Sequence, residues 1–202
     1  MRNSVVITRE IAQKVRDIVD VGLSSGLGVQ APGKLCVEAA VCFALGLPHG
    51  DDPGCVLQSL RRLKIRLNDA RWSSNQARAG GLRRLAVAQL GSDGALDDAM
   101  FVRRVVAMTI SKAVPLGLRA AAKVNSRHAA ELEAAAVHCE HEGTREAASN
   151  GERIARAAAS SAAADDAAAV AASAAASSAT AAASASAAAA AYAAADAAAS
   201  AS

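Results

Sequence analysis

The sequence predicts an all-α fold, with a compact multi-helix N-terminal domain followed by an alanine-rich helical C-terminal extension. Three observations lead to this prediction. Apolar residues before position 125 recur at spacings of three and four, as on one face of a helix. Clusters of glycine and proline separate these apolar segments into short lengths. From residue 157 to residue 202, 31 of the 46 residues are alanine, which has the highest helix propensity.

The same observations divide the chain into three parts. We predict a compact helical domain over 1–125, a surface helix and connection over 126–151, and an Ala/Ser-rich helical tail over 152–202. Hydrophobic residues make up 52% of the chain, but much of that fraction is alanine in the tail. Because alanine buries little apolar area, we expect the core to lie before residue 125 and the tail to add little to it.

The first two helices are predicted over 8–21 and within the apolar segment 35–45. Glycines end the first helix and open a loop. The second segment is apolar nearly all round, which indicates a central helix covered by its neighbours. Glu38 is the one charged residue in it.

The third and fourth helices are predicted from their caps and their apolar residues. Asp52 followed by Pro53 predicts an N-cap and a first helical position. The third helix then turns its apolar side chains to the core and its arginines outward; these apolar residues are Val56, Leu60, Leu63 and Leu67. The fourth helix is predicted over 75–90, with a close approach or a kink at Gly80–Gly81.

Three further features are predicted beyond residue 95. A fifth helix follows Asp97, and we expect Pro115 to break or bend it. A helix over 126–142 is richer in charge, so we place it on the surface. The pair Asn150–Gly151 is expected to punctuate the approach to the tail.

The N-terminal residues contain no apolar run long enough for a signal peptide, so we predict a cytoplasmic protein. The four cysteines lie in a chain that is large enough to fold without disulfides, and we expect them to be reduced. The uncharged run 167–195 is long enough to span a membrane. It lacks leucine, isoleucine and phenylalanine, so we predict no membrane span.

The formal net charge of +3 is too small to indicate a nucleic-acid partner by itself. Between residues 61 and 84, however, eight basic residues stand against one acid, Asp69. This stretch is the basis of one functional hypothesis, a nucleic-acid-binding module. Its candidate residues are Arg61, Arg62, Lys64, Arg66, Arg83 and Arg84. The alternative is a solvated face whose arginine stems cover apolar surface.

A second hypothesis is an enzyme centred on Cys36, Glu38 and His49. Cys36 stands near a helix start, where the helix dipole could lower a thiol pKa, and His49 could act as a base. The alternative is a buried, inert cysteine and a histidine in a tight turn. Glu38 must be paired, protonated or functional in its apolar helix. A structural pair with an arginine of the third or fourth helix is the interpretation we favour.

Possible metal ligands gather at residues 138–142, where two histidines, a cysteine and two glutamates are adjacent. No second cluster in the sequence completes a tetrahedral site. We therefore predict no metal site, and no motif indicates a cofactor.

Several short segments resemble those of uncharacterised bacterial and phage proteins with a helical N-terminal domain and an alanine-rich tract. The segments are 33–40, 44–51, 64–69, 72–75, 82–86, 89–92 and 139–148. The resemblance covers about three quarters of the chain at these motifs and implies no particular activity. Alanine-rich tracts also occur in proteins labelled as immunity proteins, a likeness of composition.

Composition, charge and resemblance together favour a non-enzymatic helical protein-interaction protein. We expect it to be encoded by a phage or mobile element, in an immunity-like or accessory role. Its expected partner is another protein or a second copy of the chain. Nucleic-acid binding and enzymatic activity are the alternatives.

Overall fold

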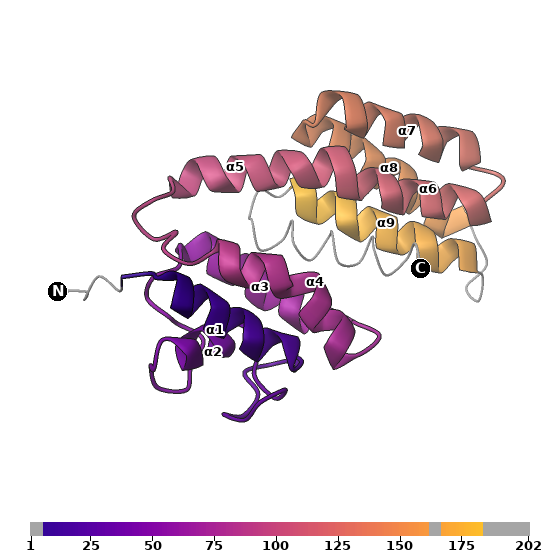
Figure 1. The fold of residues 1–202 in the computed structure, drawn as a ribbon. Helices are drawn as coiled ribbons and strands as arrows, with labels where there is room; N and C mark the ends of the chain where they lie inside the picture. The colour runs from indigo at the N-terminus through magenta and orange to yellow at the C-terminus, as the bar shows by residue number, and fades with distance from the viewer. Residues whose placement is uncertain (1–5, 162–166, 184–202) are drawn as a thin grey trace. The chain divides into compact units, whose positions relative to one another are not determined.

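Helices account for the regular secondary structure of the computed structural model, which describes residues 6–161 and 167–183 (Figure 1). No β-strand occurs in these ranges, so the predicted all-α class is confirmed. The elements are α1 (Arg9–Asp20), α2 (Val37–Ala44), α3 (Gln58–Asp69), α4 (Asn75–Ala88), α5 (Asp98–Met108), the π-helical turn η1 (Thr109–Ala113), α6 (Val114–Val124), α7 (Ala129–Glu142), α8 (Arg145–Ser161) and α9 (Ala167–Ala183).

The chain divides into two units, 1–101 and 102–202, rather than at the predicted position 125. The reason is the packing of α6. Its buried residues Val114 and Leu118 belong to one cluster with residues of α7, α8 and α9. The helices that we assigned to the end of the N-terminal domain are therefore part of the second core.

Side-chain caps fix the starts of three helices in the first unit. Thr8 Oγ1 accepts a hydrogen bond from the Ile11 N–H at 3.3 Å, and Ser74 Oγ accepts one from the Ala77 N–H at 3.0 Å. At the start of α2 the cap is the Cys36 sulfur, which accepts from the Ala39 N–H at 3.3 Å. These caps satisfy amides that the first turn leaves without partners. The predicted helices at 8–21, 35–45 and 75–90 are thus present within a few residues.

The start predicted for the third helix is wrong. The Asp52 carboxylate accepts a hydrogen bond from the Gly54 N–H at 3.1 Å, so it closes a turn instead of capping a helix. The chain enters α3 only at Gln58, after Leu57, whose side chain makes no capping bond. An aspartate before a proline can make either arrangement, because its oxygen reaches the amide two residues on as easily as a helical one.

The glycine pair Gly80–Gly81 neither interrupts nor ends α4. A Cβ built on Gly81 would overlap the Trp72 ring. The glycine therefore makes room for an indole packed on the helix, and the close approach that we predicted involves a side chain from the preceding turn rather than another helix.

The core of the first unit lies where α1 and α2 pack against α4 and where α2 packs against α3. Its main cluster is buried around α2 and consists of Val15, Val19, Leu23, Leu35, Cys36, Val37, Ala39, Ala40, Val41, Ala44, Ala79, Leu82 and Ala86. A smaller cluster of Cys55, Val56, Leu57 and Leu60 lies at the start of α3. The prediction that 35–45 is a covered central helix is confirmed for α2.

We expected Pro115 to break or bend the helix that precedes it, and the structure shows no break. The chain continues from α5 through η1 into α6. In this turn the Val114 N–H donates to the Thr109 carbonyl, five residues back. A π-helical turn supplies the space that a proline ring needs against the preceding turn, so the helical backbone continues past the proline.

Two further predictions for residues 126–151 are corrected. The helix α7 is not a surface helix on all sides, because Leu132, Ala136 and Cys139 are buried. Gly151 does not punctuate the chain but lies inside α8. A Cβ at this position would lie 3.3 Å from a Leu118 methyl group, so the glycine allows α8 to lie close to α6.

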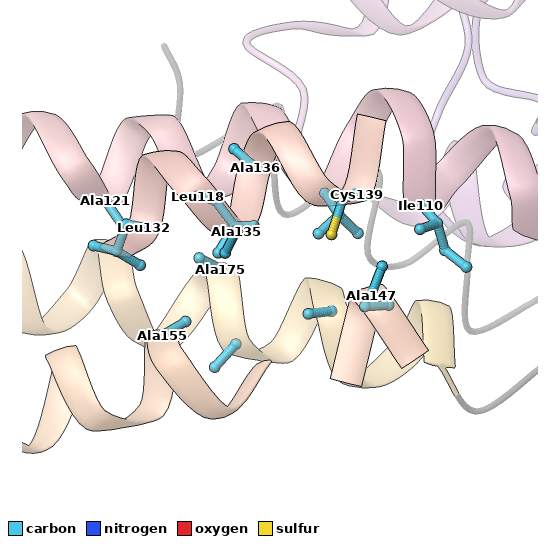
Figure 2. Packing of buried hydrophobic residues seen from close by; sticks show 14 of the residues in the cluster. Ile110, Leu118, Ala121, Leu132, Ala135, Ala136, Cys139, Ala147, Ala155 and Ala175 are labelled. Atoms are coloured by element: carbon cyan, nitrogen blue, oxygen red, sulfur yellow. The ribbon is translucent and has the colours of Figure 1, made fainter. Parts of the chain in front are cut away.

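The core of the second unit is built largely from alanine. Figure 2 shows Leu118, Leu132 and Ala135 gathered with Ala155 and Ala175 in the space between the helices. Of the 17 buried residues in this cluster, 11 are alanine. Helices α8 and α9 pack along each other. The part of the tail in α9 thus belongs to a core, which corrects the expectation that the tail adds little to it; residues 184–202 of the predicted tail lie outside the described residues.

One helical stretch among the described residues, Asp98–Val124, is long and apolar enough to cross a membrane by length and composition. Its face formed by Ile110, Val114 and Leu118 is buried in the core of the second unit. Met108, Leu116 and Val124 of the same stretch are exposed, so the stretch has a buried and an exposed apolar part.

The tight α8–α9 packing makes a testable prediction with a matched control. Ala155 is fully buried, whereas Ala157 on the same helix is exposed. We expect Ala155→Leu to lower the free energy of unfolding by about 1–3 kcal/mol, because the added methyl groups have no space. The Ala157→Leu variant should change it little. Urea unfolding of both variants is the measurement, and equal effects would contradict the packing described here.

Candidate functional site

A buried ion pair joins α2 to α3. Lys64 Nζ lies 2.7 Å from Glu38 Oε1, and the exposed fraction of both side chains is 0%. Glu38 lies in the first turn of α2, which is covered by its neighbours, and Lys64 lies on the side of α3 that packs against α2. Apart from this contact, the two Glu38 oxygens and Lys64 Nζ make no hydrogen bond with the described residues.

The environment of the pair opposes both charges. Burial raises the pKa of Glu38, while the nearby Lys64 ammonium lowers it by a smaller amount. Burial likewise lowers the pKa of Lys64, against the smaller opposing effect of Glu38. Each group therefore depends on the other to remain charged. The pair is the structural one that we predicted for Glu38, but the partner is a lysine and not an arginine.

The spacing of residues in α3 contains a signal that Lys64 is buried. Leu60, Lys64 and Asn68 are four residues apart, and all three are buried. Leu63 and Leu67, which we placed on the core face, are only partly buried. The buried face of α3 is thus rotated toward two polar residues, which a search for apolar side chains alone does not find.

A small cavity of about 110 Å³ lies beside the pair. It is lined by Gly26, Leu27, Cys36, Val37, Glu38, Asp51, Ile65, Asn68 and Asp69. Three of these residues carry a carboxylate, and three carry aliphatic side chains. The cavity therefore combines acceptor groups with apolar walls.

The loop 21–36, which connects α1 to α2, is held by hydrogen bonds from several directions. The Asp69 carboxylate accepts from the Gly26 N–H at 2.8 Å, and the Asn68 amide donates to the Ser24 carbonyl at 2.9 Å. The buried Arg78 guanidinium donates to the Leu23 carbonyl at 3.0 Å. Within the loop, backbone bonds join Ser24 to Leu35 at 2.9 Å, Val29 to Lys34 at 2.9 Å and Cys36 to Leu27 at 3.3 Å.

Apolar side chains on this loop nevertheless face solvent. Val21 is 56% exposed, Leu27 44% and Val29 57%. Hydrogen bonds from Asp69, Asn68 and Arg78 hold this loop in place. The exposed apolar side chains therefore contribute little to its stability. Loops held on a rigid scaffold often carry binding residues, so these side chains are candidates for contact with another molecule.

The residues of the enzyme hypothesis do not form a nucleophile and base. Cys36 is buried, and burial raises the pKa of its thiol, the opposite of the lowering that we predicted from the helix start. His49 is exposed, and its Nε2 lies 3.2 Å from the Gly28 carbonyl oxygen. The Glu38 carboxylate forms an ion pair with Lys64. The structure thus offers no activated thiol at this position.

The six residues of the nucleic-acid hypothesis fall into two groups. Lys64 is buried, so its ammonium does not reach the surface. Arg61 is held by Asp51 at 2.7 Å and by Asp52 at 3.4 Å, and Arg83 binds both carboxylate oxygens of Asp20.

The other three residues, Arg62, Arg66 and Arg84, are exposed. Arg62 and Arg66 are four residues apart on α3 and therefore share one face of it. Three of the six candidate residues are thus exposed and without an ion-pair partner among the described residues.

The candidate metal ligands at 138–142 are separated by their packing. Cys139 lies in the core of the second unit, where burial raises its pKa to about 11. Glu140 binds Arg119 at 2.6 Å. In the ranges that the structure describes, no three His, Cys, Asp or Glu side chains are placed to hold a metal ion.

Comparison of the chain with protein-family models, curated proteins and solved structures finds no match. The resemblance to bacterial and phage proteins stays a prediction. Functional arguments therefore depend on the residues described above.

The Glu38–Lys64 pair yields a prediction about stability. We expect Glu38→Gln to lower the free energy of unfolding by about 3 kcal/mol or more, because Lys64 remains buried without a counter-charge. The double variant Glu38→Gln with Lys64→Met should recover most of the lost free energy of unfolding, because no unpaired charge remains buried. Denaturant unfolding measures both effects, with the exposed-pair variant Asp20→Asn as a control that should change stability little.

The stability of the Glu38→Gln variant should also depend on pH. Without Glu38, the pKa of Lys64 lies further below its ordinary value of 10.5. Between the folded and unfolded pKa values the unfolded chain binds more protons, so the stability of the Glu38→Gln variant should rise with pH in this window. A stability that falls with pH over the same window would show that Lys64 is not the buried partner.

Proposed function

We propose that the chain is a non-enzymatic helical protein-interaction protein, and that its first unit binds a partner protein through the loop 21–36. The observation that carries the proposal is the exposure of Leu27 and Val29 on a loop anchored by side chains from α3 and α4. Loops on a rigid scaffold are common binding elements.

The anchoring gives a physical reason for binding at this loop. A flexible loop loses conformational entropy when a partner fixes it, and that loss weakens the complex. Here Asp69, Asn68 and Arg78 hold the loop before a partner arrives. The apolar area of Leu27 and Val29 is then available for the partner at a low entropic cost.

The test compares a double variant of the loop with a control variant. Partner binding is measured with the purified protein and in cells that express it. We expect Leu27→Ser with Val29→Ser to abolish partner capture while circular dichroism stays unchanged. Leu96→Ser is the matched control, because Leu96 is an apolar residue of the first unit that is 47% exposed. Sedimentation of the purified chain identifies a second copy as the partner if self-association is what the variant abolishes.

Two outcomes would contradict the proposal. One is a partner that binds the double variant as well as the original chain. The other is an equal loss of binding in the Leu96→Ser control, which would mean that exposed leucines act without regard to the loop.

Exposed arginines support a second candidate function, nucleic-acid binding through α3 and α4. Arg62, Arg66 and Arg84 have no ion-pair partner in the described part of the chain. We expect binding to weaken as the salt concentration rises. For duplex DNA, the logarithm of the binding constant should fall with the logarithm of the salt concentration with a slope of about −0.9 per phosphate contact. The double variant Arg62→Gln with Arg66→Gln should make this slope shallower by the amount expected for about two phosphate contacts.

The control is Arg119→Gln, which removes an arginine that already binds Glu133 and Glu140. Fluorescence anisotropy with a labelled duplex measures all the variants at several salt concentrations. Absence of binding at low salt, or an equal effect of Arg119→Gln, would remove this candidate.

A further inference from the structure

The helical stretch formed by α5, η1 and α6 has an exposed face on which basic and apolar side chains alternate. We call this row the basic–apolar stripe; its members are Arg104, Met108, Lys112, Leu116 and Lys123, and all five are exposed. Met108 is 65% exposed and Leu116 53%. Residues four or seven positions apart share one face of a helix. The stripe is therefore a continuous row along the helix and not a set of scattered side chains.

The opposite face of the same stretch is buried. Two residues after each of the first four stripe residues comes a member of the core of the second unit; these are Val106, Ile110, Val114 and Leu118. A step of two residues turns roughly 200° around a helix, which places the two rows on opposite sides. The stretch thus holds the folded unit with one face and leaves the stripe open to another molecule.

The π-helical turn η1 keeps the stripe in line. In an α-helix, with about 3.6 residues per turn, a row of residues four apart winds slowly around the axis. The turn in η1 is wider, because the Val114 N–H donates to the Thr109 carbonyl five residues back. This wider turn offsets the winding between Met108 and Leu116. The turn that accommodates Pro115 therefore also aligns the exposed row.

The charges of this stretch are all positive after Asp98. Residues 99–130 contain six lysines and arginines and no aspartate or glutamate. Arg119 pairs with Glu133 at 2.8 Å and with Glu140 at 2.6 Å, which neutralises these two carboxylates of α7. The three basic residues of the stripe form no ion pair with the residues that the structure describes. They complement an anionic surface.

The apolar members of the stripe indicate which anionic surface fits. The phosphates of a nucleic acid bind cations but cover neither Met108 nor Leu116, and the stripe has no aromatic ring on which a base could stack. A bilayer that contains anionic lipids accepts both kinds of side chain. Lysine and arginine contact its headgroups, while apolar side chains enter the boundary with the acyl chains. A flat bilayer also meets the row along its whole length of roughly 28 Å.

We propose that the basic–apolar stripe docks the second unit on a bilayer surface rich in anionic lipids. The helix lies parallel to this surface, because a membrane span would remove the buried face of the stretch from its core. The docking surface belongs to the second unit and does not depend on the partner proposed for the loop 21–36.

The experiment mixes the full chain with vesicles and measures the fraction that sediments with them. One set of vesicles contains equal parts of phosphatidylcholine and phosphatidylserine, and the other contains phosphatidylcholine alone. We expect binding to the anionic vesicles that weakens as the salt concentration rises, and little binding to the neutral ones. No binding to anionic vesicles at low salt, or equal binding to the two sets, would overturn the proposal.

A double variant tests the charges of the stripe. Arg104→Gln with Lys112→Gln should weaken binding to the anionic vesicles about 25-fold, at about fivefold for each basic residue near an anionic surface. Arg62→Gln with Arg66→Gln is the matched control, because it removes two exposed arginines from the first unit. An equal loss in the two double variants would show a general effect of net charge and contradict docking by the stripe.

A single variant tests the apolar side chains. Met108→Ser should weaken binding to the anionic vesicles about tenfold, because the methionine side chain no longer buries apolar surface. The matched control is Val170→Ser on α9, where the valine is 69% exposed, and it should bind as the original chain does. Circular dichroism checks that the variants are folded. If Met108→Ser binds as tightly as the original chain, the stripe depends on charge alone, as in binding to nucleic acid or to an acidic protein, and the bilayer is the wrong partner.

Discussion

The burial of the Glu38–Lys64 pair is the constraint on which the first unit depends. Two opposite charges without access to water must lie together, so α2 and α3 have little freedom to slide or rotate against each other. One turn after Lys64, Asn68 donates a hydrogen bond to the Ser24 carbonyl, and Asp69 accepts one from Gly26. The ion pair thus also positions the loop 21–36, its exposed apolar residues and the cavity beneath it.

Much of the first unit could be predicted from its sequence, because caps and apolar spacing agree there. The N-caps of α1, α2 and α4 are Thr8, Cys36 and Ser74, near the predicted helix starts. The start of α3 could not be predicted, since Asp52 has local alternatives of similar energy. The partner of Glu38 was missed for a different reason: eight basic residues lie between 61 and 84, and only tertiary packing decides which one is buried.

The alanine-rich tail differs most from what its sequence predicts, because α9 is part of a core. Counting buried area per residue correctly ranks alanine below leucine, but it neglects how closely two helices approach when their side chains are small. In the second unit, Gly151 and Ala155 of α8 and Ala175 of α9 are buried in such an arrangement. The candidate site shows the same limit, because the burial of Cys36 and the pairing of Arg61 and Arg83 depend on contacts between distant residues.

A core made of alanine also affects how the second unit responds to temperature. Alanine has no side-chain rotamers to lose, so its burial involves almost no side-chain entropy. Its small side chain also exposes little apolar surface on unfolding, and exposed apolar surface is the source of the positive heat-capacity change, at about 0.45 cal/mol/K per Å². We therefore expect the second unit to have a small heat-capacity change per residue, so that its free energy of unfolding varies only slowly on either side of its temperature of maximum stability.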